Sequence, residues 1–96
     1  MYRVIAFRKM GNYYSMEEML EMGRNHIKNV PDDILIQHSR KLFPQLTSRA
    51  LSGDTEAMDE LFESFAQKSA EYHEEGYTDE ARLLFSTGVF WHDKAL

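Results

Sequence analysis

Apolar residues recur every three or four positions over most of the chain, which is the spacing of one face of an α-helix. The pattern is clearest in residues 54–76, where apolar side chains keep this spacing along the whole segment. Polar residues fill the intervening positions, so each helix has one face for a core. The sequence therefore predicts a mainly α-helical small bundle of about four helices, in residues 15–28, 31–43, 54–76 and from 78 onward.

Capping residues set the ends of these predicted helices. Ser15 followed by Glu18 fits a capping box, in which each side chain satisfies a backbone amide at the helix start. Asp54 and Thr78 are the expected N-caps of the third and the last helix. Gly76 is expected to end the third helix, because glycine adopts the left-handed conformation at little cost.

Two prolines delimit the second predicted helix. Pro31 suits its first position, where the missing amide hydrogen is not needed. Pro44 also lacks an amide hydrogen and clashes with the preceding turn, so the helix should break or kink at Phe43. A further short piece, residues 45–51, follows this break.

The first ten residues have a different pattern. Residues 1–10 are rich in β-branched and aromatic side chains and are followed by the turn signal Gly11-Asn12. They predict a short N-terminal β-strand, with a short helix capped by Gly11 as the alternative. A lone strand needs a partner for its backbone groups, and the same strand of a second copy would supply one. We therefore expect a homodimer.

Composition is that of one small globular domain spanning residues 1–96. Apolar residues make up 43% of the chain and charged residues 28%, and there is no cysteine. The absence of cysteine excludes disulfides and thiolate metal sites. No apolar run approaches the roughly 20 residues that cross a bilayer. The sequence therefore predicts a cytoplasmic protein without membrane association.

The last two predicted helices resemble one helical pair of the tetratricopeptide repeat family. The match lies in the order and spacing of large, aromatic, glycine, alanine and aromatic positions, namely Phe65, Tyr72, Gly76, Ala81 and Phe85. The segment 53–57 also resembles the start of the related Sel1-type repeats. The resemblance implies that these helices form an antiparallel pair with small residues where they cross.

Charge is distributed unevenly along the chain, whose formal charge is −5. Residues 1–53 hold eight basic and five acidic side chains, a formal charge of +3, whereas residues 54–96 hold three basic and eleven acidic ones, a charge of −8. Like charges four residues apart on a helix, such as Glu56 and Glu60, each cost about 0.2–0.5 kcal/mol. Lys68 is the one lysine among the acidic residues of this helix, so stability alone does not explain the pattern.

We interpret the acidic side of the third helix as a surface that binds a basic partner protein, because complementary potentials accelerate association. Spaced carboxylates on a helix can also imitate the phosphates of a nucleic acid. The alternative is a solvated face that only keeps the protein soluble. Large aromatic residues near the chain end either seal the bundle or anchor the partner. The expected partner-binding residues are Glu56, Asp59, Glu60, Glu63, Glu71, Glu74, Phe90 and Trp91.

The N-terminal segment suggests a different function, direct binding of nucleic acid. Basic and aromatic side chains are mixed there, as in surfaces that stack single-stranded bases. The net negative charge of the chain opposes attraction to phosphate, so this remains the alternative. Its expected residues are Arg3, Arg8, Lys9, Tyr13 and Tyr14.

No residue pattern points to catalysis or to a bound metal or cofactor. The four histidines, His26, His38, His73 and His92, lack a second ligand three or four residues away on an apolar face. The serines lie in caps or helices without a strained strand-to-helix turn, and the glycines are isolated. We therefore expect a non-enzymatic adaptor, regulator or inhibitor, with no metal and no cofactor.

Overall fold

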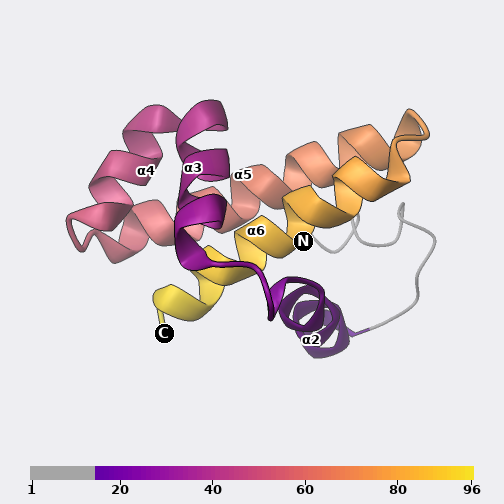
Figure 1. Ribbon diagram of the computed structural model, residues 1–96, viewed down its shortest axis with the longest axis horizontal. Coiled ribbons are helices and arrows are strands. Elements are labelled where there is room, and N and C mark those ends of the chain that lie inside the picture. The colour runs from indigo at the N-terminus through magenta and orange to yellow at the C-terminus, as the bar shows by residue number, and fades with distance from the viewer. Residues whose placement is uncertain (1–14) are drawn as a thin grey trace.

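A computed structural model describes residues 15–96, and this part of the protein is mainly helical (Figure 1). The predicted helical fold class is confirmed, but the piece after Pro44 is itself a helix, so the described residues form five helices instead of about four. The predicted strand at residues 1–10 lies outside the described part. The helices are α2 (Met16–Ile27), α3 (Asp32–Leu42), α4 (Pro44–Leu51), α5 (Thr55–Glu74) and α6 (Thr78–Lys94).

The predicted caps of α2 and α5 are confirmed. Ser15 Oγ accepts a hydrogen bond from the Glu18 amide at 3.1 Å, and the Glu18 carboxylate accepts one from the Ser15 amide at 2.9 Å. At the start of α5, the Asp54 carboxylate accepts from the amides of Glu56 and Ala57 at 3.0 and 3.3 Å. These bonds satisfy amides that have no partner within their helix.

Two predicted helix starts are wrong by one residue. Pro31 is the N-cap of α3 and not its first residue, and Tyr77 takes the N-cap position of α6 that the sequence assigned to Thr78. The reason at α6 is the tight end of α5. Gly76 has a φ of +92°, and the Tyr77 amide donates to the Tyr72 carbonyl at 2.9 Å. This turn brings Tyr77 directly to the start of the next helix.

The long helices α5 and α6 run antiparallel and side by side (Figure 1). They approach each other closely at Gly88, where an added Cβ would lie 2.9 Å from the Cβ of Phe65 and 3.2 Å from the carbonyl oxygen of Phe62. Phe62 and Phe65 face α6 from the buried side of α5. Glycine at this position therefore sets the distance between the two helices.

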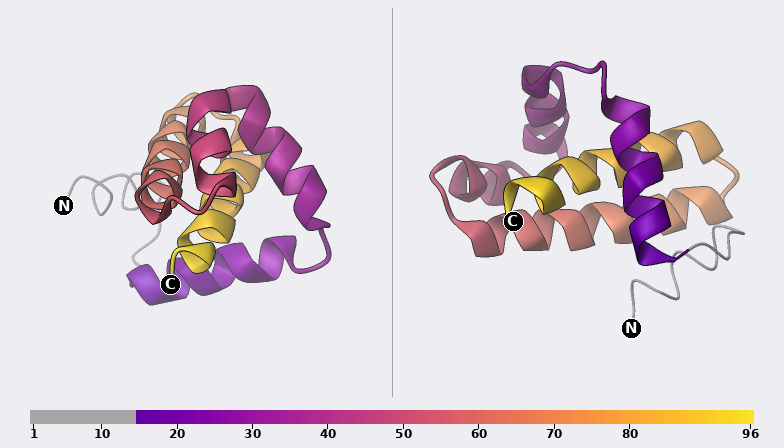
Figure 2. Two further views of the ribbon diagram at one scale, coloured as in Figure 1. Left: turned by 90° about the vertical axis from the view of Figure 1, so that its left-hand side faces the viewer. Right: turned by 90° about the horizontal axis from the view of Figure 1, so that it is seen from below.

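Helix α6 is the centre of the fold, because α2, α3 and α5 all contact it (Figure 2). Every residue from Leu84 to Trp91 is buried. Ser86 and Thr87 fit in this environment because each hydroxyl donates to the carbonyl four residues earlier at 2.8 Å. The sequence predicted one apolar face here, and the structure shows burial on all sides.

Helix α2 crosses α6 steeply and packs mainly against it (Figure 2). Gly23 lies at the crossing, since a Cβ there would be 2.7 Å from Val89 Cγ2. Helices α3 and α4 pack on each other. They cover one end of the α5–α6 pair, the end at which α5 begins and α6 ends (Figure 1). Ile34 of α3 is 49% exposed, whereas Ile36 packs against the core.

None of the helices in the described residues is long and apolar enough to span a bilayer.

Candidate functional site

Six carboxylates predicted to bind a partner lie on the exposed side of α5. The opposite side of the helix is buried, with Leu61 and Phe65 both inaccessible to solvent. The helical period that builds the core therefore also gathers the acids on one exposed side. We call this row the acidic face of α5, and it consists of Glu56, Asp59, Glu60, Glu63, Glu71 and Glu74.

The acidic face has little internal charge compensation. Apart from Glu74, which does have a partner, none of its carboxylates forms an ion pair or hydrogen bond with another described residue. Exposed carboxylates without a cation nearby sum their fields over the length of the helix. Within the described residues, the structure thus places a run of carboxylates with few ion pairs along the exposed side of α5.

One cation lies at the N-terminal end of the acidic face. The Arg49 guanidinium donates to Asp54 Oδ2 at 2.9 and 3.1 Å, and this bond, together with the amide of Ala57, lowers the pKa of Asp54. Asp54 is also the main cause of a raised pKa at Arg49, with smaller contributions from Glu60 and Glu56. Arg49 therefore offsets negative charge at the start of α5 only.

The two aromatic residues predicted as a partner anchor belong to the core. Trp91 is 1% exposed, and its Nε1 donates to Ser39 Oγ at 2.8 Å. Phe90 is 8% exposed and packs edge-on against Trp91, with ring centroids 5.0 Å apart. The sequence left two roles open for these side chains, sealing the bundle or anchoring a partner, and in the structure both of them seal the bundle. The structure therefore does not bring them together with the acidic face.

The residues of the alternative nucleic-acid surface, Arg3, Arg8, Lys9, Tyr13 and Tyr14, lie outside the described residues.

One serine and one histidine meet in the structure. Ser86 Oγ lies 3.1 Å from His26 Nδ1 and donates to the Arg82 carbonyl at 2.8 Å. Ser86 has one hydroxyl proton, and the Arg82 carbonyl competes with His26 as its acceptor. Ser86 is also buried. The pair therefore links α2 to α6 and is not the geometry of an activated nucleophile.

His38 is the histidine with the most unusual environment. Its ring stacks on Phe65 with centroids 5.8 Å apart, and its buried Nε2 has no hydrogen-bond partner in the described part of the chain. Burial lowers the pKa of His38, and the charge of Lys41 lowers it further. Across residues 15–96, no three acidic or histidine side chains cluster closely enough to hold a metal ion.

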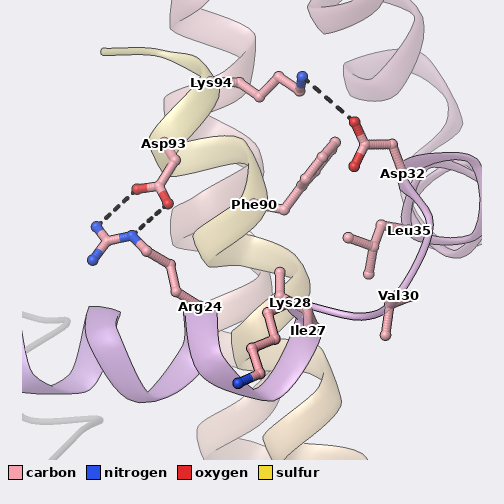
Figure 3. A pocket seen from close by; sticks show the side chains of 9 residues that line it. All are labelled: Arg24, Ile27, Lys28, Val30, Asp32, Leu35, Phe90, Asp93 and Lys94. Carbon is pink, nitrogen blue, oxygen red and sulfur yellow. Dashed lines mark hydrogen bonds and ion pairs between the residues drawn. The ribbon is translucent and has the colours of Figure 1, made fainter.

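A hollow of about 380 Å³ opens where the end of α2, the loop to α3 and the end of α6 meet (Figure 3). Its apolar surface comes from four side chains, and five charged side chains surround them. Sequence reasoning missed this site because its residues come from three separate segments. They are Arg24, Ile27, Lys28, Val30, Asp32, Leu35, Phe90, Asp93 and Lys94.

Two ion pairs border the hollow (Figure 3). Arg24 donates from Nε and Nη2 to the two oxygens of Asp93 at 2.6 and 2.9 Å, which lowers the pKa of Asp93. On the other side, Lys94 Nζ lies 3.8 Å from Asp32 Oδ2 and 5.2 Å from the centroid of the Phe90 ring. The first contact consists of two charged hydrogen bonds, whereas the second is an ion pair too long for a hydrogen bond.

Comparison with protein-family models, with curated proteins and with solved structures finds no match for this chain. The resemblance of α5 and α6 to a tetratricopeptide helical pair therefore stays a prediction.

Proposed function

We propose that this chain is a non-enzymatic interaction module, a regulator or inhibitor that binds a basic surface of another protein through the acidic face of α5. The observation that supports this most directly is a set of exposed carboxylates that form no ion pair with another residue of the described range 15–96, namely Glu56, Asp59, Glu60, Glu63 and Glu71. Like charges so close on a helix reduce its stability, so their arrangement is better explained by an external contact.

The mechanism is electrostatic complementarity. A rigid helix holds its carboxylates at fixed spacing, and five turns of α5 present them over a length of about 30 Å, at 1.5 Å per residue. A basic groove that binds nucleic-acid phosphates would match such a row of charges. In this proposal the module occupies that groove and excludes the nucleic acid, and salt weakens the complex by screening the charges.

The test compares two variants with the same net charge. Changing Glu56, Glu60 and Glu63 to glutamine removes half of the acidic face. The matched control changes the three exposed acids Glu17→Gln, Asp33→Asn and Glu80→Gln on other helices. Each protein is immobilised, incubated with extract of the native host, and the captured proteins are quantified by mass spectrometry.

A basic protein captured by the unmodified chain and by the control, but reduced at least about fivefold with the acidic-face variant, supports the proposal. The chain should then displace labelled nucleic acid from that purified protein. Equal capture by all three proteins would identify the acidic face as a solvated surface without a partner.

The alternative function is direct nucleic-acid binding by the N-terminal segment, which is supported by its mixture of tyrosine and arginine. Labelled single- and double-stranded nucleic acid, titrated with the chain at low salt, separates the two proposals. Saturable, salt-sensitive binding that disappears when Arg3, Arg8 and Lys9 are changed to alanine would favour the alternative.

We further propose that the module acts in the cytoplasm as a homodimer, with α5 and α6 arranged as a tetratricopeptide-like pair. The small core of a chain of 96 residues supports association, because small domains bury a lower fraction of their surface. Light scattering at micromolar concentration should give about twice the chain mass of 11.3 kDa. A single species at the mass of one chain would exclude the dimer.

A further inference from the structure

The hollow beside Phe90 has the size and lining of a small-molecule site. Its volume of about 380 Å³ lies within the usual range of ligand pockets, about 300–1,000 Å³. Phe90 and Leu35 form its apolar surface together with Ile27 and Val30 (Figure 3). Val30 is partly exposed, whereas Leu35, Ile27 and Phe90 are 2%, 8% and 8% exposed, so an apolar group placed here meets the edges of these side chains and leaves water there.

The charged residues around this apolar surface differ in how well they are paired. The Arg24 guanidinium donates hydrogen bonds to Asp93 and to Glu21, so the charges of these three side chains are paired with one another. Lys94 has one long ion pair, 3.8 Å from Asp32, besides its position over the Phe90 ring, and the Lys94 and Asp32 side chains are 48% and 67% exposed.

Lys28 is the second available cation. It forms no ion pair in the part of the chain that the structure describes. Its ammonium group points away from Asp32 and Lys94 (Figure 3), and the residues that line the hollow comprise three cations and two carboxylates.

We propose that this hollow binds a small aromatic carboxylate. The aromatic ring lies against Val30 and the exposed edge of Phe90, where edge-on contacts between rings are favourable. The carboxylate pairs with Lys94, which is already positioned over the Phe90 ring, and takes the place of the distant Asp32. Lys28 adds positive potential from the other end of the apolar surface (Figure 3). Helix α5 contributes no residue to this site, so it is separate from the acidic face.

The test uses three probes with the same apolar body and different charges. 3-Phenylpropionate, 3-phenylpropanol and 3-phenylpropylamine are titrated into the ¹⁵N-labelled full chain at low ionic strength, and amide shifts are followed by NMR. The acid should cause saturable shifts at Ile27, Val30, Leu35 and Phe90, the alcohol should bind more weakly, and the amine most weakly.

Three exposed lysines then test the position of the carboxylate. Lys94→Gln should weaken binding of 3-phenylpropionate about two- to fivefold, as expected for an exposed charge contact, and should leave the alcohol unaffected. Lys28→Gln should have a smaller effect. Lys41→Gln, a matched change at the other end of α3, should have none, because Lys41 does not line the hollow.

Several results would overturn the proposal. They are equal binding of the amine and the acid, unchanged affinity of the Lys94 variant, and shifts spread over residues outside the hollow. A short peptide that ends in phenylalanine is the last comparison. If it binds more than about tenfold more tightly than 3-phenylpropionate, the site belongs to a chain terminus of another protein and not to a small molecule. None of these results bears on the acidic face.

Discussion

Ser39 shows how one small polar residue holds a large aromatic residue in place. Its side chain is fully buried, donates to the Leu35 carbonyl at 2.9 Å and accepts from Trp91 Nε1 at 2.8 Å. Both polar groups are therefore satisfied inside the core, where an unpaired one is costly. The bond joins α3 to α6 and fixes the orientation of the indole ring.

Replacing Ser39 with alanine should lower the free energy of unfolding by about 1–3 kcal/mol, because the indole N–H would stay buried without an acceptor. Urea denaturation followed by the fluorescence of Trp91 measures this. Ser48→Ala, at an exposed position of α4, is the control and should change stability little. Equal stability of the two variants would mean that Trp91 finds another partner.

His38 should make the stability of the protein fall on acidification. Its folded-state pKa is below the ordinary value of 6.5, because burial disfavours the charged ring. Below pH 6.5, His38 therefore binds a proton more readily in the unfolded chain than in the folded protein. The free energy of unfolding decreases as the pH falls, until the pH passes the folded-state pKa of His38.

Changing His38 to phenylalanine, which keeps a ring against Phe65, should flatten this dependence between about pH 7.5 and pH 5.5. Urea unfolding at several pH values is the measurement. If the variant and the unmodified protein lose stability in parallel, His38 is not the group responsible.

Among the helices, the pair α5 and α6 depends on one glycine. In the middle of a helix, alanine is normally favoured over glycine by about 1 kcal/mol. At Gly88, however, the new Cβ would meet the Cβ of Phe65 at 2.9 Å. Two helix backbones cannot easily move apart while α2 and α3 also pack on α6.

Gly88→Ala should therefore destabilise the protein by about 1–3 kcal/mol despite the gain in helix propensity. Thermal unfolding followed by circular dichroism measures the change, and Gln67→Ala, on the exposed side of α5, is the control. A Gly88→Ala variant as stable as the control would show that the helix pair can widen without loss.

Local signals in the sequence were sufficient to predict four of the five described helices. Caps and breaks act within a few residues, so Ser15, Asp54, Gly76 and the break at Phe43 were identified correctly. Phe43 itself has a φ of −136° and a ψ of 71°, which is not helical. The piece after Pro44 was not recognised as a helix, although proline is well suited to a first helical position.

What the sequence could not provide is the set of contacts between helices. The uncharged run from Leu83 to Trp91 could have indicated a helix buried all round, but it was interpreted as one apolar face with an aromatic end. The acidic face could be predicted, since it needs only the period of one helix. The hollow could not, because it depends on how α2, α3 and α6 come together.

For the molecule as a whole, the two candidate surfaces are built from different helices. The acidic face belongs to α5, whereas the lysines of the hollow lie at the end of α6 and just after α2. A macromolecule bound at one surface would not cover the residues that form the other. The two proposals can therefore be tested independently on the same protein.

The attachment of α2 mainly to α6 has a consequence for hydrogen–deuterium exchange. Met19 and Leu20 of α2 pack in a core cluster with Phe85 and Val89 of α6, and two polar contacts, Arg24 with Asp93 and His26 with Ser86, join the same helices. The amides of α2 should therefore exchange through a local opening of lower free energy than those of α5 and α6, which NMR can follow. Uniform protection of all helices would instead indicate one cooperative unit. Because the hollow spans this joint, an aromatic carboxylate bound there would slow deuterium uptake in α2 first.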